Sequence, residues 1–343
     1  MSLAADWRVA SAVPRVLITT DYLAPGDDVD RYLRRAGLVT SHAPMRGRRD
    51  PRELIAALQG VDAALIANEP MTADVLAQAT SLRVIVRTGV GYDSVDADAA
   101  TELGITVSNL PGVNANAVAE YTLGLLLAAT RGLVESASGV AGGEWPRHDG
   151  HELRGATLGL VGYGATARAV VPLAKAFGMT VVCSTNVPPD ERSSDGVPID
   201  AVRFVEFDEL LGRSDYVSIH TALTERSRNL FDRTAFSAMK PTAVLVNTAR
   251  GAIVDEAALV EAVRDGRIAG AALDVVCDEP LPADSPLRDV DGIVVYSHLA
   301  GQTAEARDAA GLEGAAEIVA SLAGAPRFAV NRPRRRRRAR AQS

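Results

Sequence analysis

Short apolar runs alternate with amphipathic segments along the first third of the chain. Runs rich in aliphatic and β-branched residues predict strands at RVLITT (15–20), DAALIA (62–67), LRVIVR (82–87) and ITVSN (105–109). Between them, residues 29–37 and 51–60 have helical periodicity and end in glycine, and the second begins with Pro51, which favours a helix start. Strands that alternate with helices in this way build parallel sheets, so the pattern predicts an α/β fold.

A second series of strands and helices runs from Leu158 to about Leu299. Before it, residues 116–131 form a predicted helix with almost no polar face, the kind that is buried between domains or subunits. After it, one predicted helix over 303–322 could return to the first domain. We therefore expect two doubly wound parallel-sheet domains, the first discontinuous (residues 1–112 and 300–330) and the second inserted into it (residues 113–299), followed by a tail over 331–343.

Three residues with reactive side chains each follow a short apolar run of the second series. Arg250 ends AVLVNTAR, Glu279 comes just after AGAALDVV, and His298 ends GIVVYSH. The carboxyl ends of parallel strands border the ligand crevice of a doubly wound sheet, so we expect these three side chains to meet on one edge. Each alone could be a surface ion-pair partner or a histidine at a strand end, but their shared pattern favours a catalytic site.

The segment LGLVGYGATA (158–167) runs from a predicted strand into a glycine turn. Gly162, Gly164 and Ala167 fit the G-x-G-x-x-G/A pattern, in which the first glycine permits the turn and the second lets the backbone approach a pyrophosphate. The amides of Ala165 and Thr166 would then face the phosphates at the positive end of a helix dipole. A structural glycine turn is the alternative, but the position between strand and helix favours a dinucleotide site.

Two positions near this turn depart from the usual pattern. Pro172 lies inside the helix predicted over 165–177, where proline costs about 3 kcal/mol or kinks the helix. Thr185 follows the predicted strand TVVCS, at the place where an acidic residue usually binds the adenosine ribose. A carboxylate there would repel the 2′-phosphate of NADP, whereas Thr185, with Ser184 and Arg192, could accept it. We therefore expect NAD or NADP as the cofactor, with modest discrimination between them.

Composition narrows the possible functions. The chain has 343 residues and a formal net charge of −7, so its body does not suit nucleic acid. Seven arginines lie among the last twelve residues. Such a tail could contact nucleic acid or anionic lipid, but a solvated, disordered tail is the favoured interpretation beside an acidic body.

Cysteine content and hydropathy indicate a cytoplasmic protein. Cys183 and Cys277 are too few for a disulfide framework or a four-cysteine zinc site, and both are expected to be buried thiols in a reducing compartment. The N-terminus lacks the basic and apolar regions of a signal peptide, and no apolar segment reaches the ~20 residues of a membrane span. No cluster of metal ligands is evident, so no metal is expected.

Longer motifs add a family resemblance. In order along about residues 60–303, they are RTGVGYDSVD (87–96), NLPGVNANAVAEYTLGLLLAATR (109–131), GGEW (142–145), ELRGATLGLVGYG (152–164), DYVSIHTALTERSRNLF (215–231), VNTARGAIVDEAAL (246–259), ALDVVCDEPLP (272–282) and SHLAGQT (297–303). On these segments the chain resembles the D-2-hydroxyacid dehydrogenase family, near its phosphoglycerate dehydrogenase branch.

The resemblance implies an architecture and a set of ligand contacts. The fold would be a Rossmann NAD(P)-binding domain inserted in a flavodoxin-like substrate domain, in a homodimer built on the helix near 116–131. A small 2-hydroxy or 2-oxo acid would be the substrate, bound by the residues Arg87, Gly89, Val90, Gly91 and Arg250. The cofactor contacts implied beyond the glycine turn and Thr185 are Thr221, Thr248, Ala249, Asp274, His298 and Gly301. For Asp274, a strand-end aspartate that caps a turn is an equally good interpretation.

The chemistry of a 2-hydroxy acid agrees with the roles that the family assigns to the three strand-end residues. Oxidation removes a hydroxyl proton while hydride leaves the same carbon. His298 fits the base, or the acid in reduction, because imidazole titrates near neutral pH. Glu279 can bind the other ring nitrogen, and Arg250 can hold the carboxylate and carbonyl oxygens through forked, charge-assisted hydrogen bonds. His220 is interpreted as structural.

Some departures from the family leave the substrate open. Phosphoglycerate-specific relatives often carry basic residues where this chain reads NEPMT (68–72), and Ser297 stands where a proline often precedes the histidine. 3-Phosphoglycerate, hydroxypyruvate, glyoxylate or a specialised 2-oxo acid all remain candidates. The alternative to an enzyme is a dinucleotide-sensing regulatory protein of the same fold.

Overall fold

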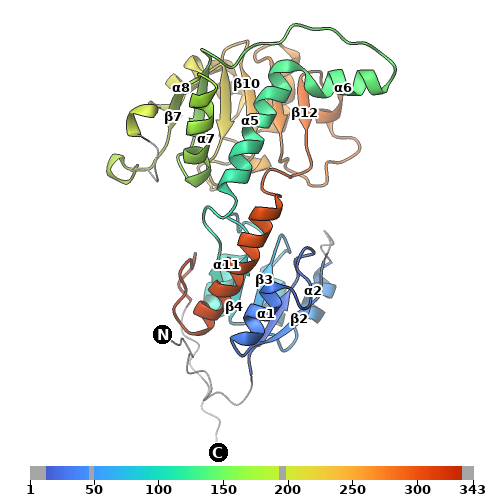
Figure 1. Ribbon diagram of the computed structural model, residues 1–343, viewed down its shortest axis with the longest axis vertical. Coiled ribbons are helices and arrows are strands. Elements are labelled where there is room, and N and C mark those ends of the chain that lie inside the picture. Colours follow the sequence, from blue (N-terminus) through green and yellow to red (C-terminus); the bar gives the residue numbers. More distant parts are fainter. Residues whose placement is uncertain (1–12, 46–49, 193–197, 334–343) are drawn as a thin grey trace, which may run out of the picture. The chain divides into compact units, whose positions relative to one another are not determined.

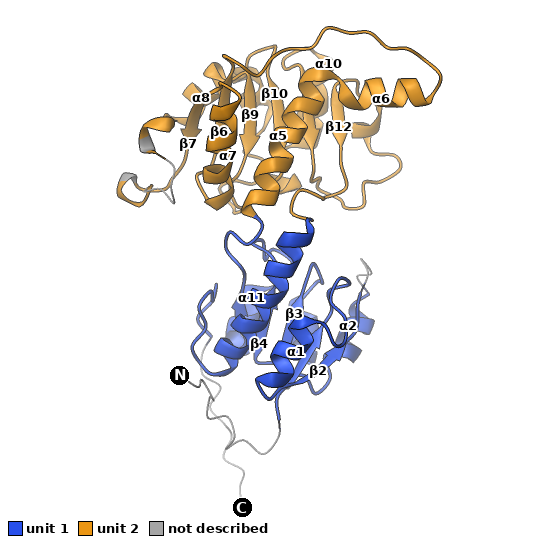
Figure 2. Cartoon of the chain, viewed as in Figure 1, with its two compact units in different colours: residues 1–114, 303–343 blue, residues 115–302 orange. Residues whose placement is uncertain are grey.

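The protein is described by a computed structural model (Figure 1), which describes residues 13–45, 50–192 and 198–333. The chain divides into two compact units (Figure 2). Unit 1 combines Met1–Asn114 with Thr303–Ser343, and unit 2 is Ala115–Gln302. The predicted α/β class, with two parallel sheets, is confirmed.

Unit 1 is built on a five-stranded parallel sheet of order β2-β1-β3-β4-β5. The strands are β1 (Arg15–Ile18), β2 (Val39–His42), β3 (Ala63–Ile66), β4 (Val84–Arg87) and β5 (Thr106–Ser108). The helices are α1 (Asp28–Arg35), α2 (Pro51–Ala57), α3 (Ala73–Gln78), α4 (Ala97–Glu102) and α11 (Ala304–Leu322). Apolar clusters fill both faces of the sheet, one beneath α2, α3 and α4 and the other beneath α1 and α11. The late helix α11 thus completes a core that begins near the start of the chain.

A segment after α11 returns to the free side of β5. Ala329 pairs antiparallel with Ser108, and the amide of Val330 donates to the carbonyl of Val107 over 2.8 Å. The Asn331 side chain accepts from the Val107 amide at 2.9 Å and donates to the Ile105 carbonyl at 2.9 Å. Asn331 therefore belongs to unit 1, which corrects its assignment to the tail, since its amide group satisfies backbone groups of the edge strand. The arginine-rich residues 334–343 lie outside the described part of the chain.

Unit 2 is built on a seven-stranded parallel sheet of order β12-β11-β10-β9-β6-β7-β8. The strands are β6 (Thr157–Val161), β7 (Thr180–Ser184), β8 (Arg203–Phe204), β9 (Tyr216–Ile219), β10 (Val244–Asn247), β11 (Gly270–Leu273) and β12 (Ile293–Val295). The α-helices are α5 (Ala115–Arg131), α6 (Leu133–Ala141), α7 (Ala165–Ala176), α8 (Phe207–Arg213), α9 (Arg233–Ala238) and α10 (Glu256–Arg264). Short 3-10 turns are η2 (Pro189–Glu191), η3 (Ile199–Ala201), η4 (Gly251–Ile253) and η5 (Pro286–Asp289).

The long apolar helix expected over 116–131 is α5, and it is followed by a second helix that the sequence pattern did not predict. Gly132 lies between them in the left-handed region with φ 55°, which ends α5 and starts α6 in a new direction, 67° away. No residue of α6 is buried. Among the described helices, none is long and apolar enough to cross a membrane alone, although α5 and α6 together meet the length and composition criteria.

Two local expectations change in the structure. Helix α7 continues through Pro172, whose ring lies on the exposed side of the helix. Cys183 is buried in β7 as expected, but Cys277 is exposed. The apolar run around residue 273 suggested a longer strand, whereas β11 ends at Leu273 and Cys277 lies in the loop beyond it.

Candidate functional site

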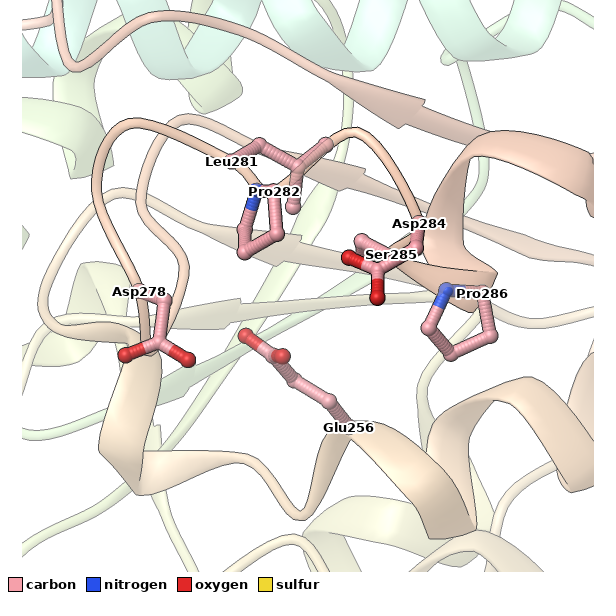
Figure 3. A pocket seen from close by; sticks show the side chains of 7 residues that line it. All are labelled: Glu256, Asp278, Leu281, Pro282, Asp284, Ser285 and Pro286. Atoms are coloured by element: carbon pink, nitrogen blue, oxygen red, sulfur yellow. The ribbon is translucent and has the colours of Figure 1, made fainter.

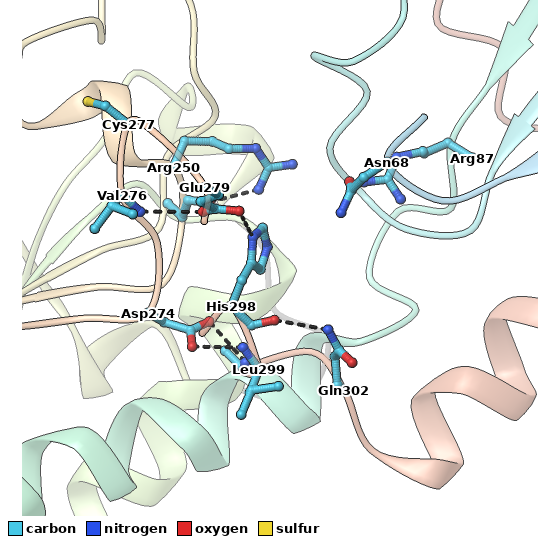
Figure 4. A network of polar contacts seen from close by, with 12 residues as sticks. Asn68, Arg87, Arg250, Asp274, Val276, Cys277, Glu279, His298, Leu299 and Gln302 are labelled. Carbon is cyan, nitrogen blue, oxygen red and sulfur yellow. Dashed lines mark hydrogen bonds and ion pairs between the residues drawn. The ribbon is translucent and has the colours of Figure 1, made fainter. Parts of the chain in front are cut away.

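The centre of the candidate site is a histidine–carboxylate pair at the carboxyl ends of neighbouring strands. Strands β10, β11 and β12 are adjacent and parallel. Glu279 lies in the loop after β11 and His298 in the turn after β12. The Nδ1 atom of His298 lies 2.8 Å from Oε2 of Glu279 (Figure 4), and the two side chains are 36% and 27% exposed. The pair is thus held by hydrogen bonding but remains open enough to meet a ligand.

Arg250 is positioned by a tight turn after β10. The buried amide of Asn247 shapes this turn, because it donates to the Arg250 carbonyl at 2.9 Å and accepts from the Ala249 amide at 3.0 Å. Gly251 has no space for a Cβ atom, since the backbone of Val276 passes directly against it. The Arg250 turn therefore lies against the loop that leads to Glu279. Sequence reasoning missed Asn247, although a polar residue closing a buried strand is a usable signal.

Asp274 comes directly after β11 and is turned into the protein. Its carboxylate is 1% exposed and accepts the backbone amides of Leu299 and Ala300, at 2.8 and 2.9 Å (Figure 4). These residues follow His298, and Gly301 comes next in the same turn. The turn-capping interpretation of Asp274 therefore describes this geometry.

The glycine turn between β6 and α7 fits a pyrophosphate. Gly162 has φ 99°, and a Cβ atom there would lie 2.7 Å from the His220 carbonyl oxygen, so only glycine suits this position. Gly164 is the N-cap of α7, has no side-chain cap, and has no atom within 4 Å of a Cβ position. The first amides of α7, including those of Ala165 and Thr166, thus begin a helix with an open N-terminus, the arrangement that binds phosphate groups. Ala167 is fully buried, as the close packing of helix on strand requires.

The end of β7 carries hydroxyl and guanidinium groups. The hydroxyl of Thr185 accepts the Val187 amide at 3.1 Å. Arg192 donates through Nε to the Val187 carbonyl at 2.8 Å, and its guanidinium lies 4.4 Å from the centroid of the Phe204 ring. The Arg192 side chain is therefore fixed beside the loop that Thr185 begins.

The remaining cofactor-wall residues lie after β9 and β10. The backbone of Thr221 passes close to Gly162, and the Thr248 hydroxyl lies 3.4 Å from that of Thr122 on α5. His220 precedes Thr221, and its Nε2 lies 2.9 Å from the Ser218 hydroxyl. Burial lowers the pKa of His220 to about 4, so its ring is neutral at physiological pH. This supports a structural role.

The proposed substrate residues Arg87, Gly89, Val90 and Gly91 lie in unit 1, at and after the end of β4. Arg87 is 9% exposed and hydrogen-bonds the Asn68 side chain from the loop after β3. The carbonyl of Val90 accepts the Asn109 side chain at 2.6 Å, and the carbonyl of Gly89 accepts the Leu110 amide at 2.9 Å. The loop is thus fastened to the segment after β5.

A separate depression in unit 2 has different chemistry (Figure 3). It is lined by three carboxylates and by apolar or small residues, namely Glu256, Asp278, Asp284, Leu281, Pro282, Ser285 and Pro286. Its lining contains none of the candidate catalytic residues. Within the described ranges, no group of three or more His, Cys, Asp or Glu side chains is arranged to hold a metal ion.

The fold and this constellation define a class first: a doubly wound α/β protein with a dinucleotide-type glycine turn. The model of the D-isomer specific 2-hydroxyacid dehydrogenase NAD binding domain matches residues 123–300. The chain is 39% identical over 276 residues to D-3-phosphoglycerate dehydrogenase of Methanocaldococcus jannaschii, covering 79% of this chain and 52% of that protein. It is 41% identical over 269 residues to glyoxylate reductase of Aeropyrum pernix, covering 76% of this chain and 79% of that protein.

A solved structure agrees with the sequence matches. An acyclic imino acid reductase in complex with NADPH and D-Arg has a TM-score of 0.79 and 25% identity, covering 92% of this chain and 99% of that chain. The protein therefore belongs to the D-isomer specific 2-hydroxyacid dehydrogenase family, as its motifs predicted. It spans about half of the length of the phosphoglycerate dehydrogenases that it matches.

Proposed function

We propose that the protein is an NAD(P)-dependent dehydrogenase that interconverts a D-2-hydroxy acid and its 2-oxo acid. The observation that carries the proposal is the 2.8 Å contact between His298 and Glu279, which lies on the same sheet edge as the open glycine turn of α7. A Rossmann-type sheet supplies the cofactor site, and the histidine–carboxylate pair supplies a proton-transfer group. Family membership supports this reaction class.

The residues of unit 2 divide the chemistry among them. A bound nicotinamide supplies the hydride acceptor in oxidation and the hydride donor in reduction. His298 takes the proton of the 2-hydroxyl group or returns it to the 2-oxo oxygen. Glu279, hydrogen-bonded to Nδ1, fixes the tautomer of the ring and stabilises the imidazolium that forms. Arg250 holds the carboxylate and polarises the carbonyl oxygen. Substrate binding by Arg87 and Gly89–Gly91 stays a prediction.

A substrate panel tests this proposal. Purified protein is assayed with NADH and with NADPH against glyoxylate, hydroxypyruvate, 3-phosphohydroxypyruvate and bulkier 2-oxo acids. We expect cofactor oxidation with at least one of them and a D-configured product. Cofactor binding without turnover on any substrate would instead favour the dinucleotide-sensing regulator.

We further propose that the protein accepts both cofactors. No carboxylate stands at position 185 to repel a 2′-phosphate, and Arg192 is held on the adjacent loop by Val187 and Phe204. Thr185→Asp is expected to weaken NADPH binding by about tenfold or more, since a like-charge contact costs several kcal/mol, and to spare NADH. The measurement is the Kd of each reduced cofactor by fluorescence. Equal effects on both cofactors would contradict the assignment.

A homodimer in the cytoplasm completes the proposal. Helix α6 buries none of its residues, and it exposes Leu133 and Val140 at 52% and 48%; Trp145 in the following loop is 75% exposed. An apolar surface of this kind suits a second copy of the chain. The free thiols of Cys183 and Cys277 fit a reducing compartment. Light scattering tests the dimer, and Val140→Glu should shift it toward monomer, with Glu135→Gln on the same helix as the control.

A further inference from the structure

We propose that Asp274 is a positioning residue, which holds the turn that presents His298 to the substrate. This inference rests on the proposed dehydrogenase function. It gives Asp274 a role through the backbone of the catalytic turn, in place of a contact with the nicotinamide amide. All of the residues involved belong to unit 2.

Three successive backbone amides converge on this one aspartate. The amide of His298 donates to the main-chain carbonyl of Asp274 at 2.9 Å. The amides of Leu299 and Ala300 donate to its two carboxylate oxygens, one each, at 2.8 and 2.9 Å. Consecutive amides that point into one concavity form an anion-binding nest, and the carboxylate of Asp274 fills this one.

The turn needs such support because His298 has an unfavourable backbone conformation. Its φ is 57°, in the left-handed region, where a side chain crowds the backbone. Asn229 is the other described residue besides glycine with a positive φ. A strained residue persists only where its surroundings hold it, and here the following two amides are tied to Asp274. The side-chain amide of Gln302 adds one more bond, to the His298 carbonyl at 3.0 Å.

Both oxygens of Asp274 are committed within the protein. The side chain is 1% exposed. Tyr121 on α5 also contacts it: burial, together with the adjacent Asp274 carboxylate, raises the pKa of Tyr121 to about 12, so the phenol stays protonated and can donate. The ring of Tyr121 in turn packs edge-on against Tyr296, with centroids 6.1 Å apart. The turn is therefore braced from the helix side as well.

The conformation of this turn decides whether the imidazole can work. His298 and Glu279 come from separate loops, and their 2.8 Å contact forms only if both loops are correctly placed. If the turn relaxes to an ordinary backbone conformation, the imidazole moves away from Glu279 and from the substrate. Misplacement of a reacting group by about 1 Å can cost on the order of 100-fold in rate. The cofactor site at the glycine turn of α7 does not depend on this contact.

The test compares Asp274→Asn with Asp215→Asn. Asparagine at 274 keeps the shape but replaces one acceptor oxygen with a donor. Asp215 is a matched control from the same unit: it precedes β9, accepts the Thr157 amide at 2.8 Å, and bonds Lys240 at 2.8 Å. We expect D274N to lower kcat by about 100-fold, with the NADH Kd changed by no more than about threefold. D215N should leave both values near those of the wild type.

A spectroscopic measurement separates positioning from general loss of structure. The Nδ1 proton of His298, held by Glu279, should give a low-field NMR signal that His298→Asn identifies. D274N should weaken this signal and leave the His220 resonances unchanged. Tyr121→Phe, which removes a single donor, should shift the same signal and lower kcat by a smaller factor; it provides the test if D274N does not fold.

The outcomes are decisive even without turnover. If D274N keeps kcat and the His298 signal of the wild type, or if its NADH Kd rises as much as kcat falls, the positioning role is wrong and a direct cofactor contact is favoured. If the wild type turns over no substrate, the proposed function fails. The NMR comparison still tests whether Asp274 holds His298 in place.

Discussion

At the scale of single residues, the site depends on hydrogen bonds that place a titratable ring. His298 gains its orientation from Glu279 on one side and from the turn after β12 on the other. Neither contact would be recognised from the histidine alone. The ring is also partly exposed, as proton exchange with a ligand requires. This combination makes His298 the residue whose removal should affect chemistry most directly.

Replacement of His298 tests its part in proton transfer. We expect His298→Ala to lower kcat by about 10²–10⁴-fold, the usual contribution of acid–base catalysis, with little change in the Kd of NADH. Steady-state kinetics and fluorescence titration measure the two quantities. Near-normal turnover would remove His298 from the mechanism.

His220 should make stability depend on pH. Its folded-state pKa of about 4 lies below the ordinary value of 6.5, so the unfolded chain takes up a proton first as the pH falls. The stabilisation is complete above pH 6.5 and is lost between 6.5 and 4. The loss should be about 2 kcal/mol, less than full burial would give, because water reaches part of the ring.

The measurement is urea unfolding at pH 7.5 and pH 5 for the wild type and His220→Asn. Asparagine can keep a hydrogen bond to Ser218 but does not titrate. The variant should therefore lose less stability than the wild type on acidification. An equal loss in both proteins would show that His220 is not the cause.

The sequence predicted the reactive residues better than the residues that position them. Arg250, Glu279 and His298 follow from one rule, that strand ends border the ligand crevice, together with their family motifs. Asn247 was missed, and Asp274 was left between two interpretations. Both act through backbone groups of turns, and the φ and ψ angles of a turn are set by tertiary contacts that a one-dimensional pattern does not record.

At the scale of elements, longer helices and buried strands follow from periodicity, whereas short elements do not. Helices α3 and α4 have six residues each, too few to display a helical period. Their starts are nevertheless marked, since Thr72 and Asp96 cap them through side-chain oxygens. Strand β2 has an exposed and partly polar face, because it lies at the edge of its sheet.

The segment after α11 depends on one buried carboxylate. Glu317 is fully buried and accepts the Ser108 hydroxyl at 2.8 Å and the amides of Arg327 and Phe328 at 3.0 and 3.2 Å. These bonds join the helix, the edge strand β5 and the returning segment. A sequence pattern could not show this, since the partners are far apart in the chain.

Glu317→Gln should therefore destabilise unit 1. An amide nitrogen would face donors that now point at an oxygen, and a buried unsatisfied group costs about 1–3 kcal/mol. We expect a loss of about that size in the free energy of unfolding of unit 1, measured by calorimetry. Glu305→Gln, exposed in the first turn of the same helix, is the control and should have little effect.

At the scale of the whole molecule, the two units should respond differently to acid. Burial raises the pKa of Asp30 in unit 1, but hydrogen bonds from Thr40, Arg34 and the Gly26 amide outweigh it and lower the pKa to about 2. This stabilisation is complete above about pH 3.8 and is lost as the pH falls through 2. His220, in unit 2, acts at higher pH.

Acidification should thus weaken unit 2 before unit 1, as far as these two groups decide it. Calorimetry between pH 7 and pH 3 should show that His220→Asn alters the dependence above pH 4. Asp30→Asn should lose about 2 kcal/mol at neutral pH and flatten the dependence below pH 4. The reverse order of effects would contradict the assignment.

The interrupted course of unit 1 also has a consequence for synthesis on the ribosome. Strands β1–β5 emerge first, but Ala310, Ala315 and Ile318 of α11, which cover one face of their sheet, emerge only after all of unit 2. At about 5–20 residues per second, that delay is on the order of tens of seconds. Throughout it the nascent chain carries an uncovered aliphatic surface, so chaperone protection during translation should matter more for the first unit than for the second.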